Sequence, residues 1–182
     1  MPPLETERLL LRDFVPSDWD ALNAFLSDPF VTRYMHFSSW NEQMRREWLA
    51  SLVKRASDPR RDAYDWAITL RSNGLLIGWL IIGRSRHARE EGMRECGCGY
   101  ALNRDYWGHG YMSEALSAAF SYAFTVLGTE LIHAECEREN AASVRVMQKC
   151  GMQYEGTMYD DDGLGNWQHR YRYVITAQME KT

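Results

Sequence analysis

Two glycines flank a histidine in the segment NRDYWGHGYMSE (residues 103–114), directly before the most regular helical pattern of the chain. The first N–H groups of a helix have no partner inside the helix, and the helix dipole adds partial positive charge there. Such an end binds anions, phosphate above all. Gly108 and Gly110 carry no side chain, so a phosphate could approach their backbone closely. The segment therefore predicts an anion site, with a tight turn before a helix as the alternative.

Two well-known phosphate loops do not fit this segment. A Walker loop ends in Gly-Lys-Ser/Thr, whereas this one continues Gly110-Tyr111-Met112. A dinucleotide-binding fingerprint needs a third glycine where this chain has Ser113, and it needs repeated strand–helix–strand units that the surrounding pattern lacks. The pattern thus favours a pyrophosphate loop of another design.

The elements that must position this loop form one α+β domain over residues 1–182, with a mainly antiparallel sheet and helices packed on it. Alternating or strongly apolar runs predict strands at residues 7–14, 64–70, 75–82, 94–102, 131–136, 152–158 and 168–177. Capping residues and i, i+3, i+4 apolar spacing predict helices at residues 17–26, 41–56, 112–127 and 140–149. A turn-rich aromatic segment is expected at residues 30–40, and a hairpin turn at residues 160–163.

Composition narrows the function classes. The net charge is −4 and the basic residues are dispersed, so a nucleic-acid partner is not expected. No run approaches the ~18 apolar residues of a membrane span. The N-terminus lacks the order of a signal peptide, so a cytoplasmic location with reduced cysteines is expected. A metal or redox pair at Cys96 and Cys98 is a weaker alternative, because no ligand-spaced cluster accompanies it.

Four stretches of the sequence resemble the GNAT acetyltransferase superfamily and, within it, the RimJ/RimL-like branch that acetylates protein N-termini. They are LETERLLLRDFVPSD (4–18), CGYALNRDYWGHGYMSEA (98–115), NAASVRVMQKCG (140–151) and the closing hairpin. The superfamily loop reads Gln/Arg-x-x-Gly-x-Gly/Ala. Here Trp107 replaces the first residue, as is usual in the branch, Gly110 matches, and Met112 replaces the final small residue.

The resemblance implies a GNAT fold: a mixed, mostly antiparallel sheet of about seven strands, flanked by helices and splayed between strands four and five. Acetyl-CoA would lie in the splay, with its pantetheine arm on the edge formed by Tyr100, Ala101 and Leu102. Trp107 and Gly108 would shape the approach to the loop. The pyrophosphate would take N–H bonds from His109, Gly110, Tyr111, Met112 and Ser113. Asn140 and Ser143 would stand beside the thiol end, and Lys149 near the phosphates.

Acetyl transfer to an amine needs a proton acceptor and, for the leaving thiolate, an optional donor. Glu95 shares a strand face with Gly97 and Gly99 and is the candidate base, with a solvated edge carboxylate as the alternative. Many relatives carry this glutamate where the chain has Gly97. They also place a donor tyrosine where this chain has Met147, so Ser143 or water would serve.

The expected function is transfer of acetyl from acetyl-CoA to a primary amine by direct attack in a ternary complex. A protein or peptide N-terminal α-amine is the favoured acceptor, and a small amine is the alternative. A non-catalytic CoA-binding module is a third possibility. The resemblance places the acceptor against the first helices, where aromatics gather, and the hairpin near Asp160, and it permits a homodimer.

Overall fold

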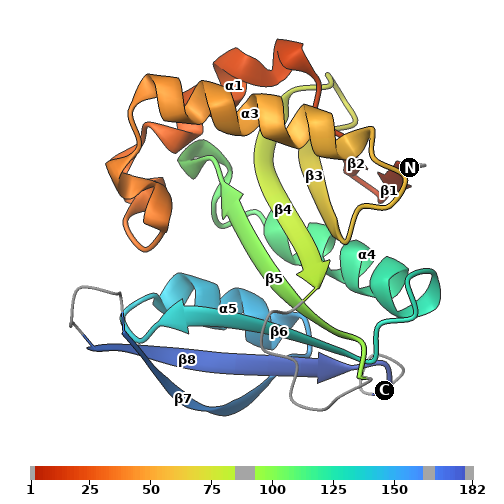
Figure 1. Ribbon diagram of the computed structural model, residues 1–182, viewed down its shortest axis with the longest axis vertical. Coiled ribbons are helices and arrows are strands. Elements are labelled where there is room, and N and C mark those ends of the chain that lie inside the picture. The colour runs from red at the N-terminus through yellow and green to blue at the C-terminus, as the bar shows by residue number, and fades with distance from the viewer. Residues whose placement is uncertain (1–2, 85–92, 162–166, 179–182) are drawn as a thin grey trace.

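The computed structural model describes residues 3–84, 93–161 and 167–178, apart from the side chains of residues 36, 37, 159–161, 167 and 168. Within them the backbone forms an eight-stranded sheet in the order β1-β2-β3-β4-β5-β6-β8-β7 (Figure 1). The strands are β1 Leu4–Glu5, β2 Leu9–Arg12, β3 Ala63–Leu70, β4 Leu76–Arg84, β5 Glu95–Leu102, β6 Leu131–Glu137, β7 Gln153–Asp161 and β8 Trp167–Thr176.

Every neighbouring pair of strands is antiparallel except β5 and β6. The expected α+β class and mixed, mostly antiparallel sheet are confirmed. The strand count is eight rather than about seven because β1 is a separate strand of two residues. Thr6 closes the turn between β1 and β2 by bonding to both backbone groups of Leu9, so the single strand predicted at residues 7–14 is wrong in its bounds.

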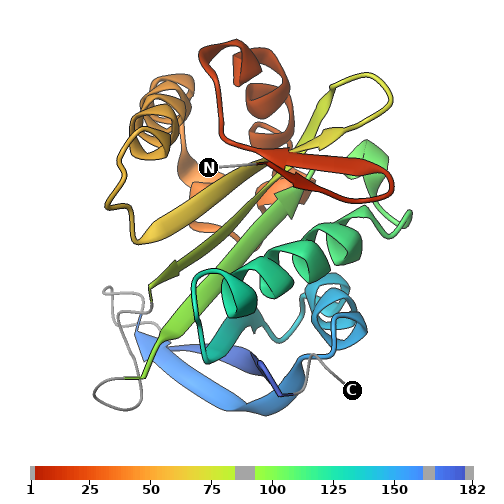
Figure 2. The same ribbon diagram turned by 90° about the vertical axis from the view of Figure 1, so that its right-hand side faces the viewer.

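The helices are α1 Trp19–Leu26, α2 Pro29–Thr32, α3 Glu42–Ala56, α4 Tyr111–Thr125 and α5 Ala141–Lys149. Helices α1 and α3 cover one face of the sheet, and α4 and α5 cover the other (Figure 2). Each face therefore buries its own apolar cluster. In none of the ranges that the structure describes is a helix long and apolar enough to cross a membrane.

Local signals account for the helix ends. The Asn41 side chain accepts a hydrogen bond from Met44 N at the start of α3, as its residue type predicted. Helix α4 follows Gly110, which has a φ of 80°, and after the helix the chain turns at Gly128, with a φ of 66°. Positive φ is strained for residues with a side chain, so glycine suits both positions.

The segment at residues 30–40 contains helix α2 and a 3₁₀ turn at His36–Ser39. In the closing hairpin, Asp161 still pairs with Trp167, so β7 runs further than the predicted strand 152–158. The predicted turn therefore begins too early, and its residues Asp162 and Gly163 lie outside the described ranges.

The sheet divides between β5 and β6. These strands pair in parallel from Glu95 with Leu131 to Cys98 with Ala134. Beyond that point β5 continues on β4 as far as Leu102, whereas β6 continues on β8 as far as Glu137. The splay expected between the fourth and fifth predicted strands, which are β5 and β6 here, is confirmed. It leaves the backbone of β5 after Cys98 without β6 as a neighbour.

Candidate functional site

The glycine loop leads directly into the N-terminus of α4. The first helical bond of α4 runs from Glu114 N to Gly110 O at 3.1 Å. The N–H groups of Tyr111, Met112 and Ser113 precede this bond, so helix geometry leaves them free to point at an anion. Gly108 and Gly110 both have a φ of 80°. The loop therefore needs glycine for its conformation as well as for close approach.

Met112, which departs from the usual small residue, does not obstruct this end. Its side chain is 5% exposed and belongs to the core cluster on the α4 face. Only the backbone of Met112 faces the loop, and its larger side chain packs in the core.

Two cations flank Gly110. A Cβ atom placed on this glycine would lie 3.6 Å from Nη2 of Arg8 and 3.8 Å from Nζ of Lys149. Arg8 comes from the turn before β2 and Lys149 from the last turn of α5, so residues far apart in sequence meet at one end of α4. Arg8 is paired with Glu114 at 2.6 Å, so Lys149 and the helix N-terminus supply most of the net positive charge that suits a phosphate here.

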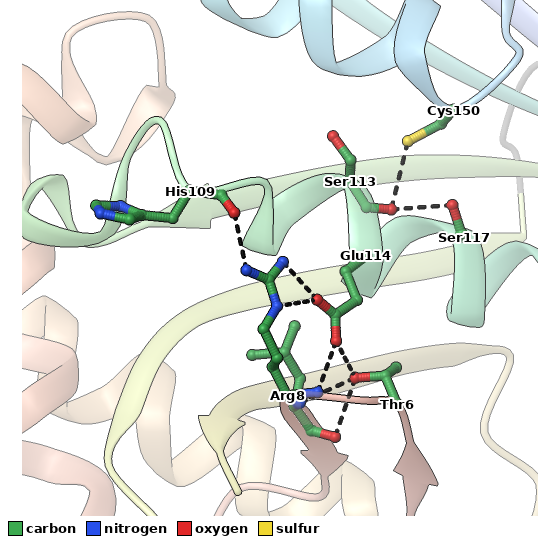
Figure 3. Close-up of polar contacts among 8 residues, drawn as sticks. Thr6, Arg8, His109, Ser113, Glu114, Ser117 and Cys150 are labelled. Carbon is green, nitrogen blue, oxygen red and sulfur yellow. Dashed lines mark hydrogen bonds and ion pairs between the residues drawn. The ribbon is translucent and has the colours of Figure 1, made fainter. Parts of the chain in front are cut away.

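Arg8 is held in place by several contacts (Figure 3). Its Nε donates to Oε2 of Glu114 at 2.7 Å, and its Nη1 donates to the carbonyl of His109 at 3.0 Å. Its guanidinium also lies 4.4 Å from the ring centre of Tyr111. The sequence indicated only the loop itself and gave Arg8 no role, because the residues that Arg8 contacts lie more than 100 positions away in the chain.

Glu114 joins the first hairpin to α4. Its Oε1 accepts from Thr6 Oγ1 at 2.5 Å and from Arg8 N at 2.9 Å. Partial burial raises the pKa of this carboxyl, but the bonds from Thr6 and Arg8 outweigh it and the net shift is downward. Glu114 is therefore an ionised structural residue.

Trp107 fastens the loop to the end of β5, where its Nε1 donates to the carbonyl of Leu102 at 2.7 Å. The predicted pantetheine edge, Tyr100 to Leu102, lies beyond Cys98, the last residue of β5 that pairs with β6. The open strand edge and the N-terminal end of α4 thus follow one another along the chain and are fixed to each other.

Ser143 and Tyr100 meet on the α5 side of this edge. Tyr100 Oη lies 2.7 Å from Ser143 Oγ, and Asn140 caps α5 by accepting from Ser143 N at 3.1 Å. Burial raises the pKa of Tyr100 well above its ordinary value, so the phenol stays protonated. Met147, at the position where many relatives have tyrosine, is fully buried. Tyr100 of β5 and Ser143 of α5 instead form a pair of hydroxyls, and sequence reasoning missed the Tyr100 side chain.

Glu95 is 2% exposed, so the alternative of a solvated edge carboxylate is wrong. Its Oε1 accepts from Arg172 Nη2 and lies 2.8 Å from His133 Nδ1. Arg172 also donates to Glu135 at 3.0 Å and to Glu155 at 2.9 Å. The sequence could not show this network, because its members come from four strands.

A cavity of about 270 Å³ lies near the end of β6, lined by Glu137, Arg138, Glu139 and His169. Tyr34, from the segment after α2, donates to the carbonyl of Glu139 at 3.5 Å. The exposed Phe30 is covered on one side by the guanidinium of Arg104. The other expected acceptor residues include Phe37 and Asp160 to Asp162, whose side chains lie outside the described part of the structure.

Cys96 and Cys98 are free thiols on the same face of β5, and burial raises the pKa of both. Cys96 Sγ contacts Thr129 Oγ1 at 3.5 Å. In the described ranges no group of three or more His, Cys, Asp or Glu side chains is placed to hold a metal ion.

A family model described as "Acetyltransferase (GNAT) domain" matches residues 8–153. The chain belongs to the GNAT acetyltransferase family. It is thus an acyltransferase that uses acetyl-CoA as its cosubstrate, and the loop, the two cations and the open β5 edge suit that molecule. This GNAT chain is 32% identical over 178 residues to a Bacillus subtilis protein named "Uncharacterized N-acetyltransferase YnaD", covering 96% of this chain and 97% of that one.

Solved structures agree with the GNAT fold. A GNAT-family acetyltransferase from Bacillus anthracis is 27% identical, with a TM-score of 0.81 and full coverage of both chains. RimJ of Mycobacterium smegmatis, in complex with CoA-disulfide, is 20% identical, with a TM-score of 0.75 over 98% of this chain and 91% of that one. A spermidine N-acetyltransferase from Vibrio cholerae, in complex with CoA and spermine, is 17% identical, with a TM-score of 0.77 over 97% of this chain and all of that one.

Proposed function

We propose that this enzyme acetylates the α-amine at the N-terminus of a protein or peptide, as the RimJ/RimL-like branch does, by direct attack of the amine on bound acetyl-CoA. The observation that carries the proposal is the junction of the open β5 edge with the loop before α4. The pantetheine arm would pair with Tyr100, Ala101 and Leu102, and the pyrophosphate would bind the N–H groups from His109 to Ser113.

Several side chains would complete the acetyl-CoA site. Trp107 and Gly108 shape the approach to the loop, and Lys149 and Arg8 supply positive charge beside Gly110. Asn140 holds the N-terminus of α5 in place. We propose that Ser143 protonates the leaving thiolate, and its contact with Tyr100 supports this role. We propose that Glu95 takes part in removing the proton of the acceptor amine, either as the base or by holding the group that accepts the proton.

The acceptor would enter near the cavity of about 270 Å³ beside β6. Glu137 and Glu139 put carboxylates at its lining, and an ammonium group is attracted by them. Although Arg138 is also in the lining, the two carboxylates outnumber it. This favours a second candidate, a small polyamine, which is the ligand class named for the Vibrio cholerae structure of similar fold. The homodimer stays a prediction, and size-exclusion chromatography with light scattering, which measures the molar mass, tests it.

The test measures CoA-thiol release from acetyl-CoA with a panel of peptides differing in their first residue and with spermidine and other small amines. Mass spectrometry locates the acetyl group on the product. Release with peptides, and acetylation at the α-amine, is the expected result. Faster release with polyamines than with every peptide would replace the first candidate by the second. Acetyl-CoA binding without release for any amine would contradict both and favour a non-catalytic CoA-binding module.

A further inference from the structure

The side chain of His133 on β6 lies against Gly97 on β5. A Cβ atom placed on Gly97 would be 3.3 Å from His133 Nε2 and 3.5 Å from its Cε1. The imidazole of β6 therefore fills the space that Gly97 leaves on the neighbouring strand. Ile132 and Ala134 belong to the core cluster on the α4 face, so by strand alternation His133 points to the opposite face. That face is the one covered by α1 and α3 farther along the sheet (Figure 1).

The imidazole of His133 lies close to the point where β5 and β6 separate. Gly97 and His133 pair one step before Cys98 and Ala134, where β5 and β6 part. One step along a strand is about 3.3 Å, so His133 stands almost at the fork. Glu95 and Leu131 pair three steps before the fork, which is about 10 Å.

The Glu95 side chain contacts His133 and Arg172 and is closed to solvent, so a substrate does not reach it. The Glu95 side chain has no exposed surface, whereas 12% of the His133 side chain is exposed. Oε1 of Glu95 lies 2.8 Å from Nδ1 of His133, although the two atoms are not aligned for a straight hydrogen bond. The same oxygen accepts from Arg172, which fixes the carboxylate.

We propose that His133 accepts the proton of the acceptor amine through Nε2 and that Glu95 is its positioning residue. This inference rests on the acetyl-transfer function proposed above. A carboxylate beside Nδ1 favours the tautomer with the proton on Nδ1, so Nε2 keeps its lone pair. Burial and the charge of Arg172 lower the pKa of His133, against the opposing effect of Glu95 and Glu135, and so leave it neutral at pH 7.

Charged groups reach this histidine from every described strand around it. Glu95 stands on β5, Glu135 on β6 itself and Arg172 on β8, with Glu155 on β7 acting on Arg172. Of these groups, Glu95, Glu135 and Arg172 act on His133 directly and decide how readily it takes up a proton. Their arrangement fixes the orientation of the imidazole ring and sets the pKa of His133.

The proton balance is complete. The substrate ammonium gives one proton to Nε2 of His133, and the free amine attacks the thioester carbon. A C–N bond forms, the C–S bond breaks, and the nitrogen loses its second proton as the thiolate gains one, directly or through Ser143. His133 then returns its proton to solvent, so the reaction yields amide, thiol and one proton.

The experiment compares His133→Gln with wild type in kcat, in the pH dependence of kcat, and in acetyl-CoA affinity. Glutamine keeps a similar size but accepts no proton at this pH. We expect a kcat about 100-fold lower, unchanged acetyl-CoA affinity and loss of the acidic limb of the profile. In Glu95→Gln the limb should remain and move to lower pH by about 1 unit, because the carboxylate no longer stabilises the imidazolium.

Glu155→Gln is the matched control, because it removes a carboxylate from Arg172 without touching His133. Its acidic limb should stay at the wild-type pH. Two results would overturn the proposal: a His133→Gln enzyme with wild-type kcat and limb, or a limb lost only in Glu95→Gln, which would make Glu95 the base itself. An inactive wild type would instead refute the acetyl-transfer function.

A wild-type measurement covers the case in which His133→Gln does not fold. NMR measures the titration of the His133 imidazole in the presence of non-reacting analogues of acetyl-CoA and of the amine. Agreement between its pKa and the acidic limb of kcat supports the proposal. A difference of more than about 1 unit contradicts it, since the limb then belongs to another group.

Discussion

Arg172→Met should be the most destabilising of the single substitutions in the charged network on β5, β6, β7 and β8. The Arg172 side chain is 6% exposed and that of Glu95 has no exposed surface. Removing one partner of such a buried pair costs about 3–5 kcal/mol, because the remaining charge is uncompensated. Glu135 and Glu155 are 27% and 29% exposed in their side chains, so water replaces Arg172 for them at about 0–1 kcal/mol each. We expect a total loss of about 4 kcal/mol at pH 7.

Urea denaturation at pH 7 measures this loss. With an m-value of about 2 kcal/mol/M, the midpoint should fall by about 2 M. The double variant Glu95→Gln/Arg172→Met removes the orphaned charge and should recover about half of the loss. The deficit should also shrink at pH 4.5. An unpaired buried carboxylate holds a proton more tightly in the folded than in the unfolded chain, so its penalty is present at high pH and fades as pH falls.

Arg46→Met is the control, because its ion pair with Glu42 has side chains 51% and 60% exposed. With the loss of its contact to the Trp19 ring included, it should cost about 1 kcal/mol. The reasoning is refuted if Arg172→Met costs no more than this control. It is also refuted if the double variant is as unstable as the single one, since the loss would then not arise from the charge of Glu95.

Three further predictions concern the loop and the α5 hydroxyl. Lys149→Met should weaken acetyl-CoA binding about 5-fold at low salt, and by less in 0.5 M NaCl because salt screens the attraction; calorimetry at the two salt concentrations measures this, and an unchanged affinity would contradict it. Ser143→Ala should lower kcat about 10-fold with little change in the KM for acetyl-CoA, since a thiolate leaves readily even without a donor; an unaltered kcat would exclude a donor role. Glu114→Gln should cost about 2 kcal/mol at pH 7 by weakening its bonds to Thr6 and Arg8. Because the pKa of Glu114 is lowered by folding, its contribution is present above the unfolded pKa and disappears as pH falls through the folded one; equal unfolding curves for variant and wild type at pH 3 would support this, and a constant difference would not.

Local chemistry alone determined a large part of this protein. The apolar stripe at i, i+3 and i+4 predicted α4, Asn41 and Asn140 cap α3 and α5 as their residue types indicate, and the glycines before α4 adopt the positive φ that their position requires. These features depend on neighbours within a few residues. For the same reason the sequence correctly placed the glycine loop before the helix, and the family resemblance supplied the splay.

Tertiary structure decided which side chains meet. Arg8 and Lys149 are 141 residues apart in sequence, yet both reach Gly110, because the first hairpin and α5 lie against opposite sides of the start of α4. The two-residue strand β1 is too short to show a period and exists only because β2 pairs with it. No local pattern indicates either fact.

The surroundings of Glu95 show most clearly what the sequence determines and what only the tertiary structure decides. Strand period placed Glu95 on one face with Gly97, which is as far as a single strand can be followed. Whether that carboxylate meets solvent, a substrate or a cation depends on the strands beside it. The parallel pairing of β5 with β6 brings His133 to Gly97, and the antiparallel pairing of β6 with β8 brings Arg172 to Glu95. The sheet order, set by packing across the whole chain, therefore decides the environment of a residue that the sequence could only nominate.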